Sequence, residues 1–143
     1  PYISAIGWVS EIIEIAGGVD IFAERSKAHK SEVRSVSSNE VICKNPDIIF
    51  ASILEDTFPI FLKFMERIKH KKIPCLAGGV FPSSVPERLL REECVDYVCR
   101  GEGEGALVDL CNALEDGTDP INIKNLWVKK DGKVVAKNSS RQS

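Results

Sequence analysis

The sequence predicts an α/β fold, with a doubly wound parallel sheet of about five strands and a C-terminal β-hairpin. Short apolar runs bounded by turn residues alternate with segments whose apolar residues recur at helical spacing. The runs are apolar throughout, which is typical of strands covered on both faces. Near the C-terminus, Asp131-Gly132 separates two strand-like segments and predicts a tight hairpin turn.

The composition indicates one globular domain. The chain has 143 residues, of which 43% are hydrophobic and 28% charged, which is enough to build a core. A formal net charge of -2 argues against a general attraction to nucleic acid or anionic membranes. The basic run at 69–72 is interpreted as a solvated helix end. No apolar run approaches the ~18 residues that a membrane span needs, so we expect no membrane insertion.

The cysteines indicate a reducing compartment. There are five of them, an odd number, and no two stand as Cys-x-x-Cys. This pattern disfavours a disulfide framework, a structural zinc site and an iron–sulfur cluster. We therefore expect free thiols in a cytoplasmic protein.

The first elements are a helix and a long loop. The helix is predicted over 8–16, where apolar residues follow helical spacing until Gly17-Gly18 stops them. Residues 19–22 are a short strand candidate. The segment 25–35 is polar, basic and without a period, and therefore predicts a loop.

Two helices and a buried strand follow. Ser37 or Ser38 is the expected N-cap of a short helix that runs through Cys43. An Asn-Pro-Asp turn then leads into the apolar strand 48–51. The segment 58–69 has the strongest amphipathic pattern, with phenylalanine, methionine and isoleucine on one face.

The rest of the chain continues the alternation. Glycines end the next strand and stop the last helix, as strand-end turns and helix C-caps require. In order, the predicted elements are a strand at 73–77, a helix at 86–91, a strand at 95–99, a helix at 104–114, hairpin strands at 125–130 and 133–137, and a polar tail at 139–143.

Three loops at the carboxyl ends of the predicted strands form the candidate site. In doubly wound sheets, ligands bind outside these strand ends. Glycines there let a ligand approach the backbone closely; the alternative is that each loop is only a tight turn. The candidate residues are Ser52 and Leu54 after the first of these strands, Gly78, Gly79 and Val80 after the second, and Gly101, Glu102 and Gly103 after the third.

No catalytic constellation accompanies these loops. Glu102 and Glu104 are read as acids that favour a helix N-terminus rather than as metal ligands or catalytic groups. His29 and His70 lie in polar or basic surroundings without a partner. Cys99 is read as a buried structural thiol. The sequence contains no nucleophile triad, Walker lysine loop or dinucleotide fingerprint.

The strand-end loops carry a family resemblance. The segments NPDIIFASILEDTFP, IPCLAGGVFPSSVPE, VDYVCRGEGEGALVDLC and INIKNLWVKKDGKVVAKN, within 45–141, resemble the cobalamin-binding domain of cobalamin-dependent radical S-adenosylmethionine proteins. Ser52-Ile53-Leu54 matches the family's Ser-x-Leu and Gly78-Gly79 its Gly-Gly. The resemblance implies a flavodoxin-like fold in which these loops line the groove for the nucleotide tail of cobalamin.

Two departures limit what the resemblance implies. The Asp-x-His-x-x-Gly loop that supplies an axial histidine in related corrinoid domains is absent, since the corresponding region reads Ala5-Ile6-Gly7-Trp8. Histidine ligation of cobalt is therefore not expected. The chain also lacks a Cys-x-x-x-Cys-x-x-Cys motif for an iron–sulfur cluster, so we expect no catalysis by this chain without a further domain.

The first third resembles a different family. PYISAIGWVSEIIEIAGGVDIF and SEVRSVSSNEVICKNPDIIF are similar to the C-terminal lobe of periplasmic cobalamin- and siderophore-binding proteins of ABC importers. This resemblance implies that Gly7 and Trp8 face the ligand, although Trp8 is equally well read as a staple packing on its helix. Together the two resemblances predict a chimera, engineered or recombined, within one domain: a periplasmic-type half at 1–50, a radical-enzyme-type half at 51–138, and a tail at 139–143.

Two functions remain open on sequence grounds. The first is a cobalamin-binding module that holds a corrinoid at the strand-end loops without a catalytic core of its own. The second is a structural chimera that retains no ligand. A flavin or phosphate binder is a weaker third reading, because no Ser/Thr-rich loop follows the first strand. An edge strand with exposed apolar side chains offers a route to a homodimer.

Overall fold

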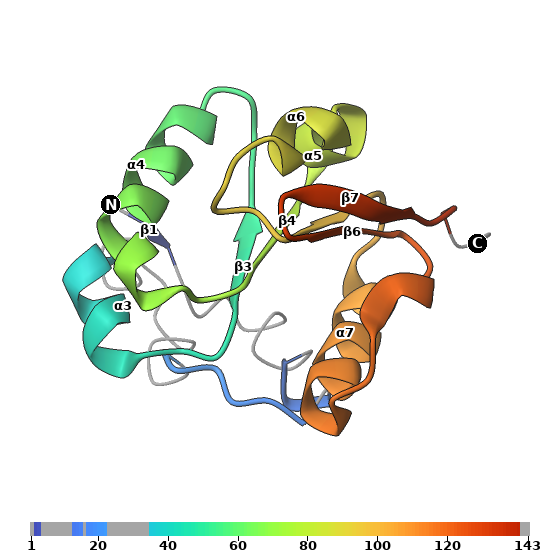
Figure 1. Cartoon of the computed structure of the whole chain (residues 1–143). Helices are drawn as coiled ribbons and strands as arrows, with labels where there is room; N and C mark the ends of the chain where they lie inside the picture. Colours follow the sequence, from blue (N-terminus) through green and yellow to red (C-terminus); the bar gives the residue numbers. More distant parts are fainter. Residues whose placement is uncertain (1, 4–12, 16, 23–34, 141–143) are drawn as a thin grey trace.

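A five-stranded mixed sheet forms the centre of the molecule (Figure 1). The computed structural model describes residues 2–3, 13–15, 17–22 and 35–140. The strand order is β3-β4-β5-β6-β7. The strands β3, β4 and β5 are parallel to one another, and β6 pairs antiparallel with both of its neighbours, β5 and β7. The strands are β3 (Ile49–Ser52), β4 (Cys75–Gly78), β5 (Tyr97–Cys99), β6 (Leu126–Lys130) and β7 (Lys133–Lys137). The α/β fold with a parallel start and a C-terminal hairpin is confirmed.

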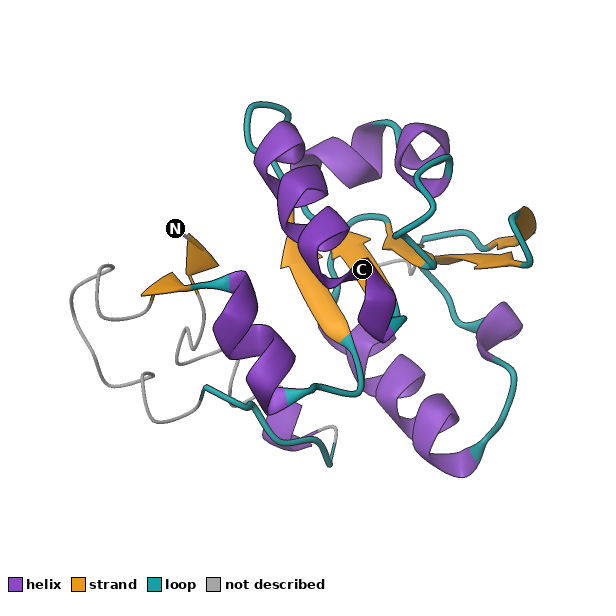
Figure 2. Cartoon of the chain, turned by 60° about the vertical axis from the view of Figure 1, so that its left-hand side comes forward, coloured by secondary structure: helices purple, strands orange, loops and turns teal. Residues whose placement is uncertain are grey.

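Helices cover both faces of this sheet (Figure 2). One face carries the core built with α4 (Phe58–Ile68), α5 (Val80–Ser84) and α6 (Pro86–Leu90), and α3 (Ser38–Lys44) packs against α4. The other face carries α7 (Glu104–Asp116). Two short 3-10 turns, η2 (Lys69–Lys71) and η3 (Pro120–Asn122), follow α4 and α7. A separate antiparallel pair consists of β1 (Tyr2–Ile3) and β2 (Ser35–Val36).

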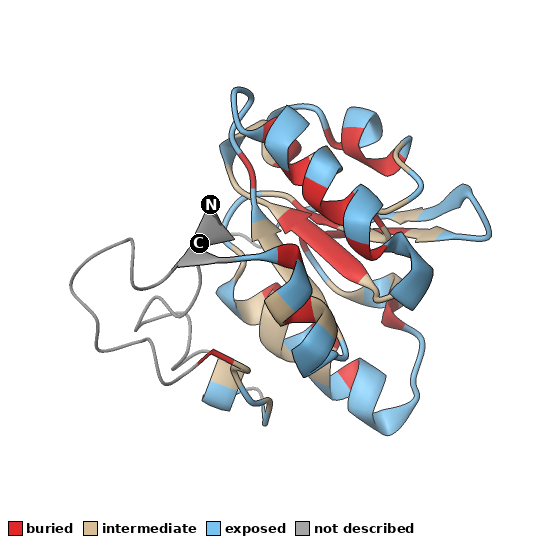
Figure 3. Ribbon diagram, turned by 90° about the vertical axis from the view of Figure 1, so that its left-hand side faces the viewer, coloured by how far each residue is buried: buried red, intermediate tan, exposed pale blue. Residues whose placement is uncertain are grey.

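The alternation of side chains along the strands divides the core into two layers. In β4, Cys75 and Ala77 belong to the cluster under α4 and α6, whereas Leu76 belongs to the cluster under α7. Because successive strand residues point to opposite faces, a strand apolar throughout is buried on both sides. Figure 3 shows the buried residues between the helices and the sheet.

Local signals account for the helix boundaries. Ser37 is the N-cap of α3, in a capping box in which its side chain and that of Glu40 bond each other's backbone amides. The apolar stripe predicted at 58–69 is buried over Phe58, Phe61, Phe64, Met65 and Ile68. Gly117 ends α7 in the left-handed conformation, as predicted. No helix in the described ranges is long and apolar enough to cross a bilayer.

The strand predicted at 19–22 is wrong. The amide of Phe22 donates to the Asp20 carboxylate at 2.9 Å, so it is engaged in a local turn. Val19 is 83% exposed, whereas Phe22 is 4% exposed and joins the core under α4. Of the helix predicted over 8–16, residues 13–15 are helical and the others lie outside the described residues, as do 25–34 of the predicted loop.

Helix α5 was not predicted from the sequence, and β5 begins at Tyr97 rather than at residue 95. The five residues of α5 are too few to show a period, and the helix is stabilised by tertiary packing: Pro82 is buried and the Phe81 ring lies 5.2 Å from that of Phe58. Val95 belongs to the turn before β5, since its amide donates to the Glu92 carbonyl at 3.1 Å.

The hairpin forms as predicted, with one irregularity. A register shift lies between Val128 and Lys129, and the Lys129 ammonium donates to the carbonyls of Leu90 at 3.2 Å and Glu92 at 2.7 Å. Along β7, Val134 and Val135 are 39% and 49% exposed. Lysines at both ends of β7 oppose antiparallel pairing with a second copy, and the homodimer stays an untested prediction.

Candidate functional site

The three predicted loops meet at one edge of the sheet because β3, β4 and β5 are parallel neighbours. The pairing register places Ser52 opposite Gly78. The ladder extends one residue further, since the Ile53 amide donates to the Gly78 carbonyl at 2.9 Å. We call this edge the strand-end surface; its residues are Ser52, Leu54, Gly78, Gly79, Val80, Gly101, Glu102 and Gly103.

Gly79 joins the first two loops. It has a φ of +103°, and a Cβ on it would lie 3.1 Å from the Ser52 Oγ and 3.2 Å from both the amide nitrogen and the carbonyl oxygen of Ile53. A side chain is therefore excluded by backbone conformation and by contact with the neighbouring strand. Sequence reasoning gave both glycines the same role, but the structure separates them. Gly78 has room, since its nearest neighbour would be the Cys99 Cβ at 4.0 Å.

Exposed groups surround this junction. Ser52 is exposed, and Leu54 and Val80 are 52% and 72% exposed on the two neighbouring strand ends. The first loop is closed by Thr57, whose hydroxyl accepts from the Leu54 amide at 3.0 Å and donates to the Leu54 carbonyl at 3.1 Å. Two large apolar side chains next to a hydroxyl form a surface suited to a large ligand with apolar and polar parts.

The third loop is fixed by hydrogen bonds to residues of other segments, Ser83 and Asn125. The Gly101 amide donates to the Ser83 hydroxyl at 2.9 Å, and the Asn125 side-chain amide donates to the Glu102 carbonyl at 2.7 Å. The Arg100 guanidinium donates to the Ser83 carbonyl at 3.0 Å and lies 5.4 Å from the centre of the Trp127 ring. Gly101 has a φ of +80°, and a Cβ on it would meet nothing within 4 Å. The loop is thus anchored on one side and open on another.

Glu102 and Glu104 are interpreted from the sequence as acids at a helix N-terminus, and their positions beside and within the first turn of α7 agree with that. Glu104 occupies the first turn of α7, where a negative charge is favourable. Glu102 is exposed, and its carbonyl is the acceptor for Asn125. Among the described residues, no group of three or more His, Cys, Asp or Glu side chains is arranged to hold a metal ion.

The remaining candidates lie elsewhere or outside the described residues. His70 is in η2, which precedes β4, and so lies toward the opposite edge of the sheet from the strand-end surface. Gly7, Trp8 and His29 fall outside the described residues. The roles predicted for Gly7 and Trp8 therefore stay predictions.

Two functional candidates escaped sequence reasoning. Ser83 is in α5, which was itself missed, and Asn125 lies 23 residues from its partner Glu102. Asn125 is 3% exposed and has a positive φ of 70°. Asparagine tolerates that conformation better than most residues, but no local pattern connects it with the loop that it contacts.

The five cysteines are free thiols. Burial raises the pKa of the Cys75 thiol far above its ordinary value and that of Cys94 to about 11, and it also raises the pKa of Cys111. Cys99 is 3% exposed behind the third loop, where its Sγ lies 3.9 Å from the Glu102 carbonyl. Because the thiolate is the reactive form, the raised pKa values give Cys75, Cys94 and Cys111 low reactivity in the folded protein. Burial shields the Cys99 thiol from reagents.

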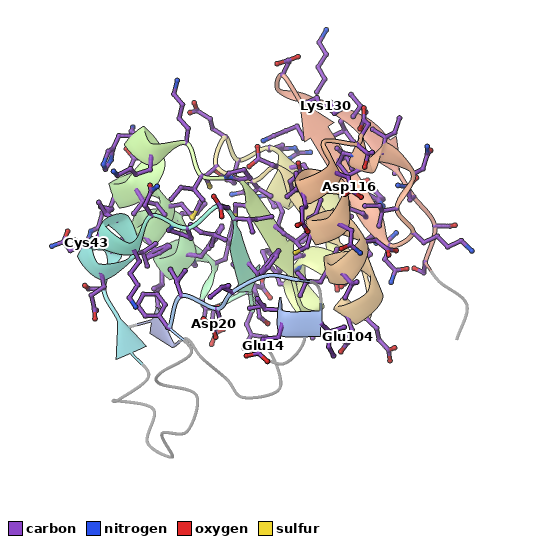
Figure 4. All side chains as sticks on the ribbon, turned by 90° about the horizontal axis from the view of Figure 1, so that it is seen from below. Glu14, Asp20, Cys43, Glu104, Asp116 and Lys130 are labelled. Carbon is purple, nitrogen blue, oxygen red and sulfur yellow. The ribbon has the colours of Figure 1, made fainter. Side chains whose placement is uncertain are left out.

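Alkylation tests this reading of the cysteines. Cys43 is exposed on α3 at the outer edge of the molecule (Figure 4). With iodoacetamide near neutral pH, we expect Cys43 to be modified first and the buried Cys75 and Cys99 only after unfolding. Mass spectrometry of the digested protein measures the order of modification. Labelling of Cys75 as rapid as that of Cys43 in the native protein would contradict the structure.

The described residues form an α/β sheet with helices on both faces and glycine-rich loops at the carboxyl ends of its parallel strands. This places the chain in the class of Rossmann-like α/β domains. Residues 11–111 match the family model of the B12 binding domain. The chain belongs to this family.

Two curated relatives are methyltransferases. An uncharacterized methyltransferase of Pyrococcus horikoshii is 33% identical over 95 residues, which is 63% of this chain and 20% of that protein. Tryptophan 2-C-methyltransferase of Streptomyces laurentii is 29% identical over 93 residues, 63% of this chain and 16% of that protein. This chain therefore spans about a fifth or less of the length of these relatives.

Solved structures share the fold. The radical S-adenosylmethionine methyltransferase TsrM of Kitasatospora setae superposes with a TM-score of 0.70 at 16% identity, over 96% of this chain and 28% of that one. The cobalamin-dependent S-adenosylmethionine radical enzyme OxsB, with aqua-cobalamin and S-adenosylmethionine bound, superposes with a TM-score of 0.60 at 21% identity, over 73% of this chain and 15% of that one.

The comparisons favour one family along most of the chain. The B12 binding match runs from 11 to 111 and crosses the strand at 48–51 where the expected chimera would join its halves. The periplasmic-type half and the chimera receive no support from these matches.

Proposed function

We propose that this chain is the cobalamin-binding module of a longer methyltransferase and that cobalamin binds at the strand-end surface. The observation that carries the proposal is the junction of Ser52, Gly78 and Gly79, where the strand register sets an exposed hydroxyl beside a backbone that admits no side chain at Gly79. It lies within the part of the chain that matches the B12 binding domain.

The surface divides by polarity. Leu54 and Val80 offer apolar contacts to the macrocycle. Ser52 and the Gly101–Gly103 backbone offer hydrogen-bonding groups to the polar tail. These residues would bind and orient the cofactor. Cobalamin, when bound, would supply a cobalt centre capable of the methyl transfer that a methyltransferase requires.

We propose that no histidine of this chain binds cobalt. The support is the absence of an Asp-x-His-x-x-Gly motif and the position of His70 toward the opposite sheet edge. A variant with both His29 and His70 replaced by alanine is expected to bind cobalamin with an unchanged visible spectrum. A shifted spectrum in that variant would argue for histidine ligation.

Hydroxocobalamin binding tests the proposed function. After incubation and gel filtration, we expect the protein to retain about one equivalent of corrinoid, measured by visible absorbance. Ser52→Ala should weaken binding by about two- to tenfold, the effect of one neutral hydrogen bond. Ser84→Ala is the matched control, because that hydroxyl bonds within its own helix to the Val80 carbonyl at 2.9 Å. Wild-type protein that retains no colour would refute the proposal.

A further inference from the structure

The third loop is shaped by residues that do not belong to it. Its backbone at Arg100, Gly101 and Glu102 is held by one backbone carbonyl and two side chains, which belong to Asn125 and Ser83. The Arg100 amide donates to the Asn125 carbonyl at 2.9 Å, and the Asn125 side-chain amide donates to the Glu102 carbonyl at 2.7 Å. Between these two contacts, the Gly101 amide donates to the Ser83 hydroxyl at 2.9 Å.

Asn125 is a buried residue with a backbone conformation that is unfavourable for a residue other than glycine. It is 3% exposed and adopts a φ of 70°, a region that non-glycine residues seldom occupy. Its own amide donates to the Ser139 carbonyl at 2.9 Å. Because an unpaired buried polar group is costly, the Asn125 side-chain amide favours the loop conformation that keeps the Glu102 carbonyl within hydrogen-bond distance.

A loop with two glycines needs such anchoring if it is to bind a ligand. Gly101 and Gly103 leave the free loop with many backbone conformations, and ordering them on binding would cost affinity. Anchors present before binding remove that cost. Because the anchors hold one side and a Cβ on Gly101 would meet nothing within 4 Å, the other side stays open to a ligand.

We infer that Asn125 is a positioning residue that holds the Gly101–Gly103 loop in the shape that receives the polar tail of the corrinoid. The inference rests on the proposed function. The tail is assigned to this loop because the loop is an exposed backbone segment with two glycines, and a Cβ on Gly101 would meet nothing within 4 Å. The neighbouring strand ends instead present the apolar side chains of Leu54 and Val80. The Ser83 hydroxyl acts in the same way from α5.

Two corrinoids separate positioning from general stability. Cobalamin carries the nucleotide tail, and cobinamide lacks it. Asn125→Asp keeps the size of the side chain and its tolerance of a positive φ but places a carboxylate oxygen against the Glu102 carbonyl. We expect Asn125→Asp to weaken cobalamin binding by about tenfold or more, as for a lost buried hydrogen bond, and to change cobinamide binding by less than about twofold.

Asn138 supplies the matched control. Its side-chain amide also donates to backbone carbonyls, but to those of Ile121 and Ile123, both at 2.8 Å, which lie outside the third loop. Asn138→Asp should therefore lower thermal stability without changing the ratio of the two affinities. If Asn125→Asp does not fold, Ser83→Ala gives the same test, because it removes the acceptor of the Gly101 amide.

The outcomes are distinct. A selective loss of cobalamin affinity in Asn125→Asp or Ser83→Ala supports the inference. Equal losses for both corrinoids, or no loss for either, overturn it while the proposed function stands. A wild-type protein that binds neither corrinoid overturns the proposed function and the inference together.

Discussion

Replacing Gly79 with alanine is expected to destabilise the fold by about 2–6 kcal/mol. Gly79 has a φ of 103° and a ψ of -171°, a region that is nearly exclusive to glycine. That conformation costs another residue about 1–3 kcal/mol, and an added atom in a tight contact costs about 1–3 kcal/mol more. The Cβ would meet the Ile53 backbone at 3.2 Å, and a backbone cannot turn away as a flexible side chain can. Chemical denaturation of the wild-type and variant proteins measures the difference in the free energy of unfolding.

Gly78→Ala is the matched control for this change. The two glycines are adjacent in sequence, yet Gly78 does not have a positive φ, and its Cβ would lie 4.0 Å from the nearest atom, in ordinary contact. We expect Gly78→Ala to change stability by less than about 1 kcal/mol. Gly79→Ala should also reduce cobalamin retention, because relief of the contact moves Ser52. Equal stability of the two variants would contradict the described junction.

Leu110→Ala is expected to cost about 2–5 kcal/mol, the range for truncating a buried leucine. Leu110 is 0% exposed and lies in the middle of α7, in the core on the second face of the sheet. Truncation leaves a cavity between α7 and the sheet. Because the protein interior is close-packed, the surrounding side chains can fill this cavity only in part. Thermal or urea denaturation gives the free energy of unfolding.

Leu114→Ala tests the same helix one turn later. Leu114 is 39% exposed, so its truncation should cost less than about 1 kcal/mol. Similar losses for Leu110 and Leu114 would mean that α7 packs on the sheet through a different face. The comparison therefore tests the second layer of the fold.

Elements with strong local signals could be predicted from the sequence. The capping box at Ser37, the apolar stripe of α4 and the Asp131-Gly132 turn each specify their structure within a few residues. The strand at 19–22 failed because a four-residue apolar pattern carries little information and the Asp20 side chain captures an amide locally. The helix α5 was missed because its stability comes from Phe58 and the surrounding core.

The candidate site divides in the same way. Sequence alone determined which loops follow the strands, that glycines and Ser52 lie in them, and which family they resemble. Only the tertiary structure decided that Gly79, rather than Gly78, cannot carry a side chain, and that Ser83 and Asn125 anchor the third loop. The physical reason is range: turns and caps depend on neighbouring residues, whereas contacts across strands depend on a register that the whole sheet must form first.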